Sequence, residues 1–426
     1  MSMALEGIKV IDVSQVAAVR VCARHLADFG ADVIHVENPV TGDSWRVFQA
    51  VSAAGQQAAP SDFNYNWENF NRNKRSLALD IAKEGGREIL YKLIKQADVF
   101  VSNLRQFELE RYGLQHATLS RINPRIISGN VSGYGKTGPD KNLPAYDTTA
   151  YWSRSAIPYV LSLPGLPCFG YRPAIGDNVA GMTLAFGIMT ALYVREKTGV
   201  GQEVETSLLH TGMYQNSFDI AGALATGMDF EDWRENPPPE VVAQAQMAAM
   251  QVIAFYGNKA TNPLSGAYIT RDFKIVVFVA LQPDRYWKKF CQCIGREDMG
   301  NDPRYATVEG RAEHCLLIRQ EIGQAFMGKT LAEWIPLLEG MPYAPMQSVK
   351  EAINDPQARA AGCFVAYDHP THGRIEALAN PVNLSHTPAT IRMAAPEFSQ
   401  HTEEVLLEAG YTWEDIGRFK EQGLIA

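Results

Sequence analysis

Residues 8–36 read IKVIDVSQVAAVRVCARHLADFGADVIHV, and this stretch contains the repeating unit of the fold. Its first six residues are rich in β-branched side chains and predict a strand, while residues 21–29 have the spacing of a helix that ends at Gly30. Residues 32–36 predict a second strand. A strand, a helix and a strand in succession predict a parallel strand pair with a helical crossover.

The alternation of strands and helices continues beyond this unit. The further strands are expected at residues 75–81, 98–101, 125–131 and 202–207, and the further helices at residues 85–96, near Leu119 and at residues 178–197. Such an alternation builds a largely parallel sheet that is covered by helices. We therefore predict an α/β fold with a large, open, Rossmann-like sheet.

A proline-rich and highly charged segment at residues 231–240 marks the clearest domain boundary. Before it, residues 38–73 are rich in alanine, glutamine, asparagine and aromatic residues and predict a long loop system. Beyond it, residues 266–270 and 274–280 predict a β-hairpin, and helices follow. The last part of the chain predicts short strands and turns and then a helix at residues 402–408.

Composition and charge exclude several classes of function. The 426 residues are 46% hydrophobic and 20% charged, with a net charge of −8, which is typical of a globular protein and argues against a nucleic-acid-binding surface. The N-terminus lacks the pattern of a secretory signal, and no uninterrupted apolar stretch approaches the roughly 18 residues of a membrane span. We expect a cytoplasmic protein of two domains with no membrane or nucleic-acid partner.

Several motifs suggest ligands but lack the context that those ligands need. Residues 133–138 match GxGxxG after an expected strand, but Pro139 and Pro144 follow, and no helix can begin there to hold a dinucleotide. His369 and His372 resemble paired metal ligands without a third at a suitable spacing, so we predict no metal. The six cysteines are scattered and predict neither disulfides nor a zinc site: Cys22, Cys168, Cys291, Cys293, Cys315 and Cys363.

Asp177 is the strongest candidate for chemistry. It follows Gly176 and precedes the apolar helix expected at residues 178–197, which is the position of an N-cap whose side chain accepts the first free amides. A carboxylate at a helix start, beside a glycine that leaves room for a substrate, is also well placed as a nucleophile. The residues around Asp177 are compatible with both roles.

Many separated segments resemble the family III CoA-transferases, the group that contains formyl-CoA transferase and carnitine CoA-transferase. The matching segments are residues 5–12, 26–37, 73–80, 97–99, 103–104, 111–114, 132–139, 176–182, 198–202 and 401–406. Each segment alone is weak, but their order and spacing over nearly the whole chain are specific. Within the family, residues 138–144, 147–154 and 208–214 look most like the branch that acts on 2-hydroxy acids, such as phenyllactate CoA-transferase.

The resemblance implies an architecture for the whole chain. Residues 1–225 would form the first part of a large α/β domain, residues 226–340 a linker and a smaller α+β domain, and residues 341–426 would return to the large domain. Two such chains would interlock as a homodimer. The substrates would be an acyl-CoA and a free carboxylic acid, and coenzyme A would enter as part of a substrate, with no permanently bound cofactor.

The resemblance also implies residue roles. Asp177 would attack the donor thioester and form a mixed anhydride, and the CoA thiolate would convert this anhydride into an aspartyl-CoA thioester. Backbone amides near Gly176 and Gly135 would stabilise the oxyanions that form. The residues that match the family's CoA contacts are Val16, Ala18, Leu79, Asn103 and Arg111. Arg20 departs from the family pattern and would either bind a substrate carboxylate or lie in solvent.

Two alternatives to CoA transfer belong to the same fold. The α-methylacyl-CoA racemases share the aspartate but need a histidine where this chain has Tyr146. Tyrosine is a poor base near neutral pH, and transferases often have tyrosine at this position, so Tyr146 favours a transferase. A non-catalytic CoA-binding relative is the second alternative, and the presence of Asp177 argues against it.

Overall fold

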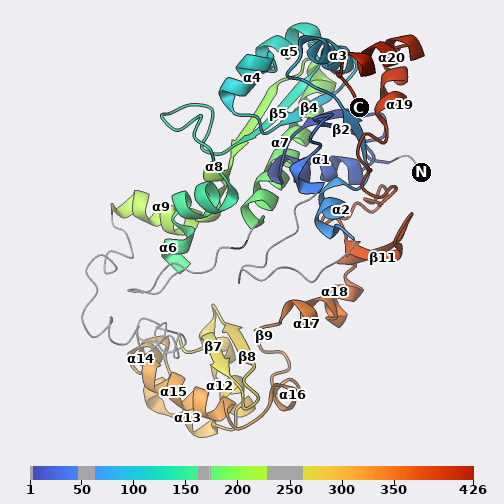
Figure 1. The fold of residues 1–426 in the computed structure, drawn as a ribbon. Helices are drawn as coiled ribbons and strands as arrows, with labels where there is room; N and C mark the ends of the chain where they lie inside the picture. Colours follow the sequence, from blue (N-terminus) through green and yellow to red (C-terminus); the bar gives the residue numbers. More distant parts are fainter. Residues whose placement is uncertain (1–2, 47–62, 162–171, 173, 228–261) are drawn as a thin grey trace. The chain divides into compact units, whose positions relative to one another are not determined.

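The computed structural model describes residues 3–46, 63–161, 172, 174–227 and 262–426, which form two compact units (Figure 1). Of the described residues, 3–46, 63–161, 172, 174–227 and 360–426 belong to the larger unit, and 262–359 belong to the smaller unit. The charged segment at residues 231–240 and Cys168 lie outside the described residues. The other five cysteines are free thiols.

A sheet of six parallel strands is the centre of the larger unit. Its strands are β1 (Lys9–Val13), β2 (Asp32–Glu37), β3 (Lys74–Ala78), β4 (Val99–Ser102), β5 (Ile127–Ser132) and β6 (Glu203–Ser207). Their order is β3-β2-β1-β4-β5-β6, and every neighbouring pair is parallel. The predicted open α/β sheet is confirmed. Its order reverses between β1 and β4, where the carboxyl ends of the strands leave a crevice in such folds.

Helices cover both faces of this sheet because neighbouring strand residues point to opposite sides. Val10 packs into the core under α1 (Ala18–Asp28) and α7 (Ile175–Thr198), whereas Ile11 packs into the core on the other face. The helices on that second face are α3 (Glu84–Ile94), α4 (Gln106–Tyr112), α5 (His116–Ile122), α19 (Thr402–Glu408) and α20 (Trp413–Glu421).

The close packing of α1 on α7 requires a glycine. A Cβ atom at Gly181 would overlap the carbonyl oxygen of Ala18. By length and hydropathy alone α7 could cross a membrane, as many core helices could, but 44% of its most apolar window is buried inside the protein. Its hydropathy therefore agrees with a helix of the core.

The C-terminal segment completes the edge of the sheet next to β3. Ile425 forms a β-bridge with Leu79, and the amide of Asp80 donates to the carbonyl of Leu424 at 2.8 Å. At the start of α19, the amide of Ala78 donates to Thr402 Oγ1 at 2.9 Å. Residues far apart in the sequence thus share one hydrogen-bonded edge.

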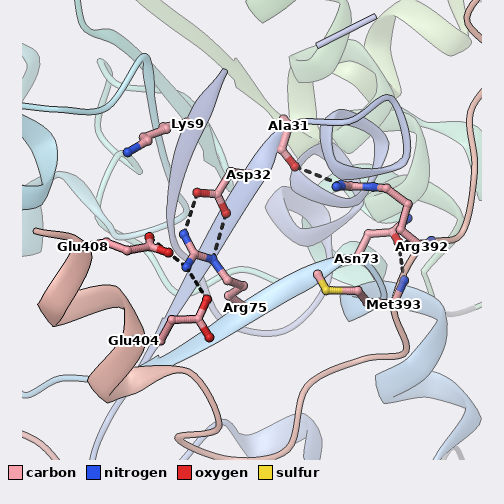
Figure 2. A pocket seen from close by; sticks show the side chains of 9 residues that line it. All are labelled: Lys9, Ala31, Asp32, Asn73, Arg75, Arg392, Met393, Glu404 and Glu408. Carbon is pink, nitrogen blue, oxygen red and sulfur yellow. Dashed lines mark hydrogen bonds and ion pairs between the residues drawn. The ribbon is translucent and has the colours of Figure 1, made fainter. Parts of the chain in front are cut away.

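A polar hollow of about 460 Å³ lies at the amino ends of β1, β2 and β3 (Figure 2). Arg75 donates to both carboxylate oxygens of Asp32, at 2.9 and 2.6 Å, and its third nitrogen lies 2.9 Å from Glu404 and from Glu408. Arg75 on β3 thus links β2 to α19 at the amino ends of the strands, opposite to the crevice.

The smaller unit contains an antiparallel sheet of β7 (Ser265–Ile269), β8 (Ile275–Val279) and β9 (Tyr343–Pro345). The predicted hairpin is confirmed as β7 and β8, while the third strand, β9, was not expected. The sheet packs on an aromatic core that includes Phe278, Phe290 and Phe326. The described helices of this unit are α12 (Pro283–Cys293), α13 (Glu297–Asn301), α14 (Val308–Glu313), α15 (Cys315–Phe326), α16 (Leu331–Trp334) and α17 (Val349–Ile353).

Some expectations from the sequence were incomplete. Within the segment expected as a loop, Tyr65–Asn71 forms helix α2, because Asn64 caps it by accepting from the amide of Trp67 at 3.0 Å. The short helix α18 (Pro356–Ala360) is followed by the hairpin of β10 (Phe364–His369) and β11 (Gly373–Leu378). The C-terminal helix α19 is confirmed, and α20 follows it.

Candidate functional site

A cavity of about 430 Å³ lies in the larger unit at the carboxyl ends of β1, β4 and β5. It occupies the crevice between β1 and β4, where the strand order reverses. Its lining residues are Gln15, Val16, Ala17, Ala18, Asn103, Leu104, Arg105, Glu108, Val131, Ser132, Gly133, Lys141, Leu143, Pro144, Ala145, Tyr146, Asp147, Asp177 and Leu208. This cavity brings together most of the residues that the sequence singled out.

The turn after β1 forms one wall and has an unusual backbone. Val16 has a φ of 63°, a conformation that a β-branched residue rarely adopts. The side chain of Asn103 holds the preceding residue: Oδ1 accepts from the amide of Gln15 at 3.0 Å, and Nδ2 donates to its carbonyl at 2.6 Å. Asn103 therefore fixes the turn that brings Val16 and Ala18 to the cavity.

Asp177 lies in the first turn of α7, so the prediction that it caps this helix is wrong. The helix begins at Ile175, three residues earlier than expected, and Ala174 is the N-cap with a φ of 68°. Because Ala174 turns the chain in the left-handed conformation, Asp177 enters the helix proper and its side chain reaches the cavity. The first turn is still a favourable place for a carboxylate next to the positive end of the helix dipole.

Asp147 is a second carboxylate in the cavity, and it was not singled out from the sequence. Asp147 begins the π-helical turn η2 (Asp147–Trp152), and the residue is 7% exposed. Burial raises the pKa of Asp147 to about 6, although the amides of Gly176 and Ala174 act in the opposite direction. Neither of its oxygens has a hydrogen bond of standard geometry.

The environment of Asp177 disfavours its negative charge. Burial, and then repulsion by Asp147, raise the pKa of Asp177 to about 7. Two acidic groups with raised pKa values in one cavity are typical of a functional site, because a structural carboxylate is usually paired with a cation.

The glycines named from the sequence lie beside the cavity and do not line it. A Cβ atom at Gly176 would overlap Asp147 Oδ1 and the ring of Tyr151, so only glycine fits there. Gly135 has a φ of 106°, and its amide donates to Ser132 Oγ at 3.0 Å. Tyr146 does line the cavity, and it is 65% exposed.

The five residues matched to CoA contacts are not all in one place. Val16, Ala18 and Asn103 line the cavity, and Leu79 lines a neighbouring hollow of about 170 Å³ that shares Gln15, Leu104 and Glu108 with it. Arg111 is exposed on α4, where its guanidinium lies 5.5 Å from the centre of the Tyr112 ring, and it lines neither hollow.

Two cations of the cavity wall were not found from the sequence. They are Arg105, which precedes α4, and Lys141 in the loop after β5. Arg105 pairs with Glu108, with Nε 3.1 Å from Oε2. No sequence signal distinguished these two residues from the other dispersed basic residues.

Arg20 does not lie in solvent, so that alternative is wrong. It is fully buried in α1 and forms an ion pair with Asp43. Close by, Lys74 Nζ lies 3.0 Å from Asp12 Oδ2, and His35 Nδ1 lies 3.2 Å from the same oxygen. We call these five residues the buried charge cluster; none of them lines the cavity.

The remaining motifs gave no site. The next described element after the glycine-rich residues 133–138 is η2, so no helix begins at that loop. His369 Nε2 lies 3.6 Å from Glu68 Oε2, and its ring packs against His372 with centres 4.9 Å apart. Among the described residues, no group of three or more His, Cys, Asp or Glu side chains could hold a metal ion.

Comparisons with known proteins agree over almost the whole chain. The model of CoA-transferase family III matches residues 5–402. The (R)-2-hydroxy-4-methylpentanoate CoA-transferase of Clostridioides difficile is 32% identical over 99% of this chain and 100% of its own length. The cinnamoyl-CoA:phenyllactate CoA-transferase of Clostridium sporogenes is 30% identical over 96% of this chain and 94% of its own length.

The fold has a counterpart among solved structures. A CAIB/BAIF family protein from Brucella suis matches with a TM-score of 0.75 over 96% of this chain and 100% of its own, at 24% sequence identity. This similarity extends to both units and supports the α/β architecture described above.

Proposed function

Because the chain belongs to CoA-transferase family III, we propose that its CoA transfer proceeds through covalent intermediates on Asp177. The observation that carries this proposal is the position of Asp177 in the cavity, with its pKa raised to about 7 by burial and by Asp147. A carboxylate of higher pKa is a stronger nucleophile, and near neutral pH a substantial fraction of Asp177 is still ionised.

The steps follow from the chemistry of a carboxylate nucleophile. An Asp177 oxygen attacks the thioester carbonyl carbon, a C–O bond forms, the C–S bond breaks, and CoA leaves as a thiolate. The thiolate then attacks the aspartyl carbonyl carbon, which gives an aspartyl-CoA thioester and releases the donor acid. The acceptor acid repeats both steps in reverse, so the free energy of the thioester is conserved without a nucleotide. The amide of Gly135, which was expected to stabilise an oxyanion, already donates to Ser132 Oγ, so we give it no role in these steps.

The acid substrates are proposed to be 2-hydroxy acids. The two relatives named above carry such an acid in their names, and this agrees with the branch that the sequence resembles. Leu143, Tyr146 and Leu208 give the cavity wall an apolar part that would suit the side chain of such an acid. Arg105 and Lys141 are the wall's cations and would face the phosphates of CoA.

We also propose that two copies of the chain associate through α7, α8 (Leu208–Gln215) and α9 (Ser217–Thr226). These helices expose Phe186, Tyr214 and Phe218, which are 75%, 73% and 91% exposed. Large apolar patches on one face are typical of association surfaces. Light scattering should give the mass of a dimer for the wild type and a smaller mass for Phe186→Asp; a monomeric wild type would contradict this.

Intact-protein mass spectrometry tests the covalent mechanism. The protein is incubated with cinnamoyl-CoA or acetyl-CoA, and the mass increase is mapped after trapping with hydroxylamine. The label should fall on the peptide that contains Asp177, and Asp177→Asn should lose both the label and CoA exchange. Asp368→Asn is the matched control, because the side chain of Asp368 is 84% exposed on β10. Substantial exchange by Asp177→Asn would exclude the mechanism.

Racemisation is the second candidate because a carboxylate with a pKa of about 7 would also suit a base. A racemase would exchange the α-proton, so incubation with a 2-methylacyl-CoA in heavy water would place deuterium at C2. We expect no deuterium uptake, since Tyr146 stands where the second base is needed. Rapid uptake without CoA exchange would make Asp177 a base.

A further inference from the structure

Asp147 is a buried carboxylate that the transfer steps above do not use. It lies against the first turn of α7, because a Cβ atom at Gly176 would overlap its Oδ1. Asp177 follows Gly176 directly, and both carboxylates line the same cavity. The amides of Ala174 and Gly176, at the positive end of the helix, lower the pKa of Asp147 against the effect of burial and so favour its anionic form next to the nucleophile.

The other charged groups of the cavity do not neutralise this pair. The titratable residues of the wall are Arg105, Glu108, Lys141, Tyr146, Asp147 and Asp177. Arg105 is paired with Glu108. Among the charges of the described residues, Asp147 is the one that shifts the pKa of Asp177, in the same direction as burial.

We propose that Asp147 promotes the acylation of Asp177 by repelling its negative charge. This inference rests on the proposed function. Before the attack, both carboxylates are ionised and repel each other. When the C–O bond forms and the C–S bond breaks, the negative charge leaves Asp177 and departs with the CoA thiolate. Acylated Asp177 is neutral, so the repulsion is present in the reactant state and absent in both covalent intermediates.

The protonation states fit this role. The pKa of Asp147 is raised to about 6 and that of Asp177 to about 7, so both carboxylates lose their protons near neutral pH. Because the two groups interact, the cavity titrates as a pair.

The pH dependence of acylation tests the proposal. The rate of label incorporation from cinnamoyl-CoA is measured between pH 5 and 9 in the wild type, Asp147→Asn and Asp147→Glu. In the wild type the rate should rise with a midpoint near 7. In Asp147→Asn the midpoint should fall by about one pH unit, the scale of a close like-charge interaction, and the plateau should fall several-fold. Asp147→Glu keeps the charge and should keep the midpoint.

An Asp147→Asn variant with a lower plateau and an unchanged midpoint would overturn the proposal, because Asp147 would then serve only the structure. If Asp147→Asn does not fold, Asp147→Ser is the second neutral variant. If neither folds, carboxyl ¹³C titration of the wild type decides, and two independent one-step titrations would refute the repulsion. A wild type that exchanges CoA without any label on Asp177 would instead refute the proposed function.

Discussion

The buried charge cluster and the cavity lie on the same sheet, and they differ in charge balance. In the cluster, burial would raise the pKa of Asp12, but Lys74 and His35 outweigh this effect and hold it well below its usual range. In the cavity, burial and Asp147 act together on Asp177 and raise its pKa to about 7. The buried charge cluster stabilises its carboxylate with charged partners, whereas the cavity holds the carboxylate of Asp177 without a cationic partner among the described residues.

This difference separates a structural role from a chemical one. Buried ions are tolerated when partners and hydrogen bonds compensate for lost hydration, and removing one partner is then costly. A carboxylate without a partner costs stability and gains reactivity, which is the usual compromise at active sites. The predictions below test whether the two sites follow these opposite rules.

The largest change in stability is expected when one cation of the buried charge cluster is removed. Lys74→Met should lower the free energy of unfolding by about 3–5 kcal/mol, because it removes the ammonium group that pairs with the buried carboxylate of Asp12. Urea denaturation measures the change. Lys420→Met is the matched control: its partner Glu403 and Lys420 itself are about half exposed, so a loss below about 1 kcal/mol is expected. Equal losses in the two variants would contradict the distinction.

In the cavity, by contrast, removing a charge is expected to raise the free energy of unfolding. Asp177→Asn should raise the free energy of unfolding at pH 8 by on the order of 1–2 kcal/mol, after allowance for the partial exposure of Asp177. The folded-state pKa of about 7 lies above the usual value of 3.8, so the wild type loses stability as the pH rises between them. The difference between variant and wild type should therefore disappear near pH 4. Destabilisation by Asp177→Asn at pH 8 would show that the carboxylate is paired.

The smallest effect concerns the cations of the cavity wall. Arg105→Gln should weaken CoA binding by about 1 kcal/mol, since Arg105 faces the cavity but already shares its charge with Glu108. Calorimetric titration with CoA gives the dissociation constant. Arg111→Gln is the comparison, because Arg111 matches a family CoA contact but lies outside both hollows. A larger loss for Arg111 would move the phosphate site to the exposed side of α4.

The sequence predicted the sheet well because β1, β2 and β4 are short runs rich in β-branched residues and the strands alternate with helical segments. It placed the starts of α1 and α7 three residues too late, since Ala18 and Ile175 carry no start signal and Ala174 adopts a left-handed conformation. The short helices α2 and α4 are each seven residues long and depend on tertiary contacts that periodicity does not show.

The site was predicted only in part. Asp177 was found through a family pattern, but Asp147 looked like one acidic residue among 47 Asp and Glu residues. Its importance comes from its place against Gly176, which depends on how η2 and α7 pack. Likewise, Arg20 was ambiguous because its partner Asp43 belongs to another segment. Pairing between distant residues is a property of the fold, and a local pattern cannot reveal it.

The hydrogen-bonded edge next to β3 has a consequence for how the protein is made. The ribosome releases residues in order, so all six strands of the large sheet emerge before α19 and α20, which follow the whole smaller unit. Until then, one apolar face of the nascent sheet lacks the helices that contribute Val405, Leu406, Ile416 and Phe419 to its core. Newly made chains therefore wait with part of that face uncovered, and they carry during synthesis an aggregation-prone apolar surface that the finished protein has buried.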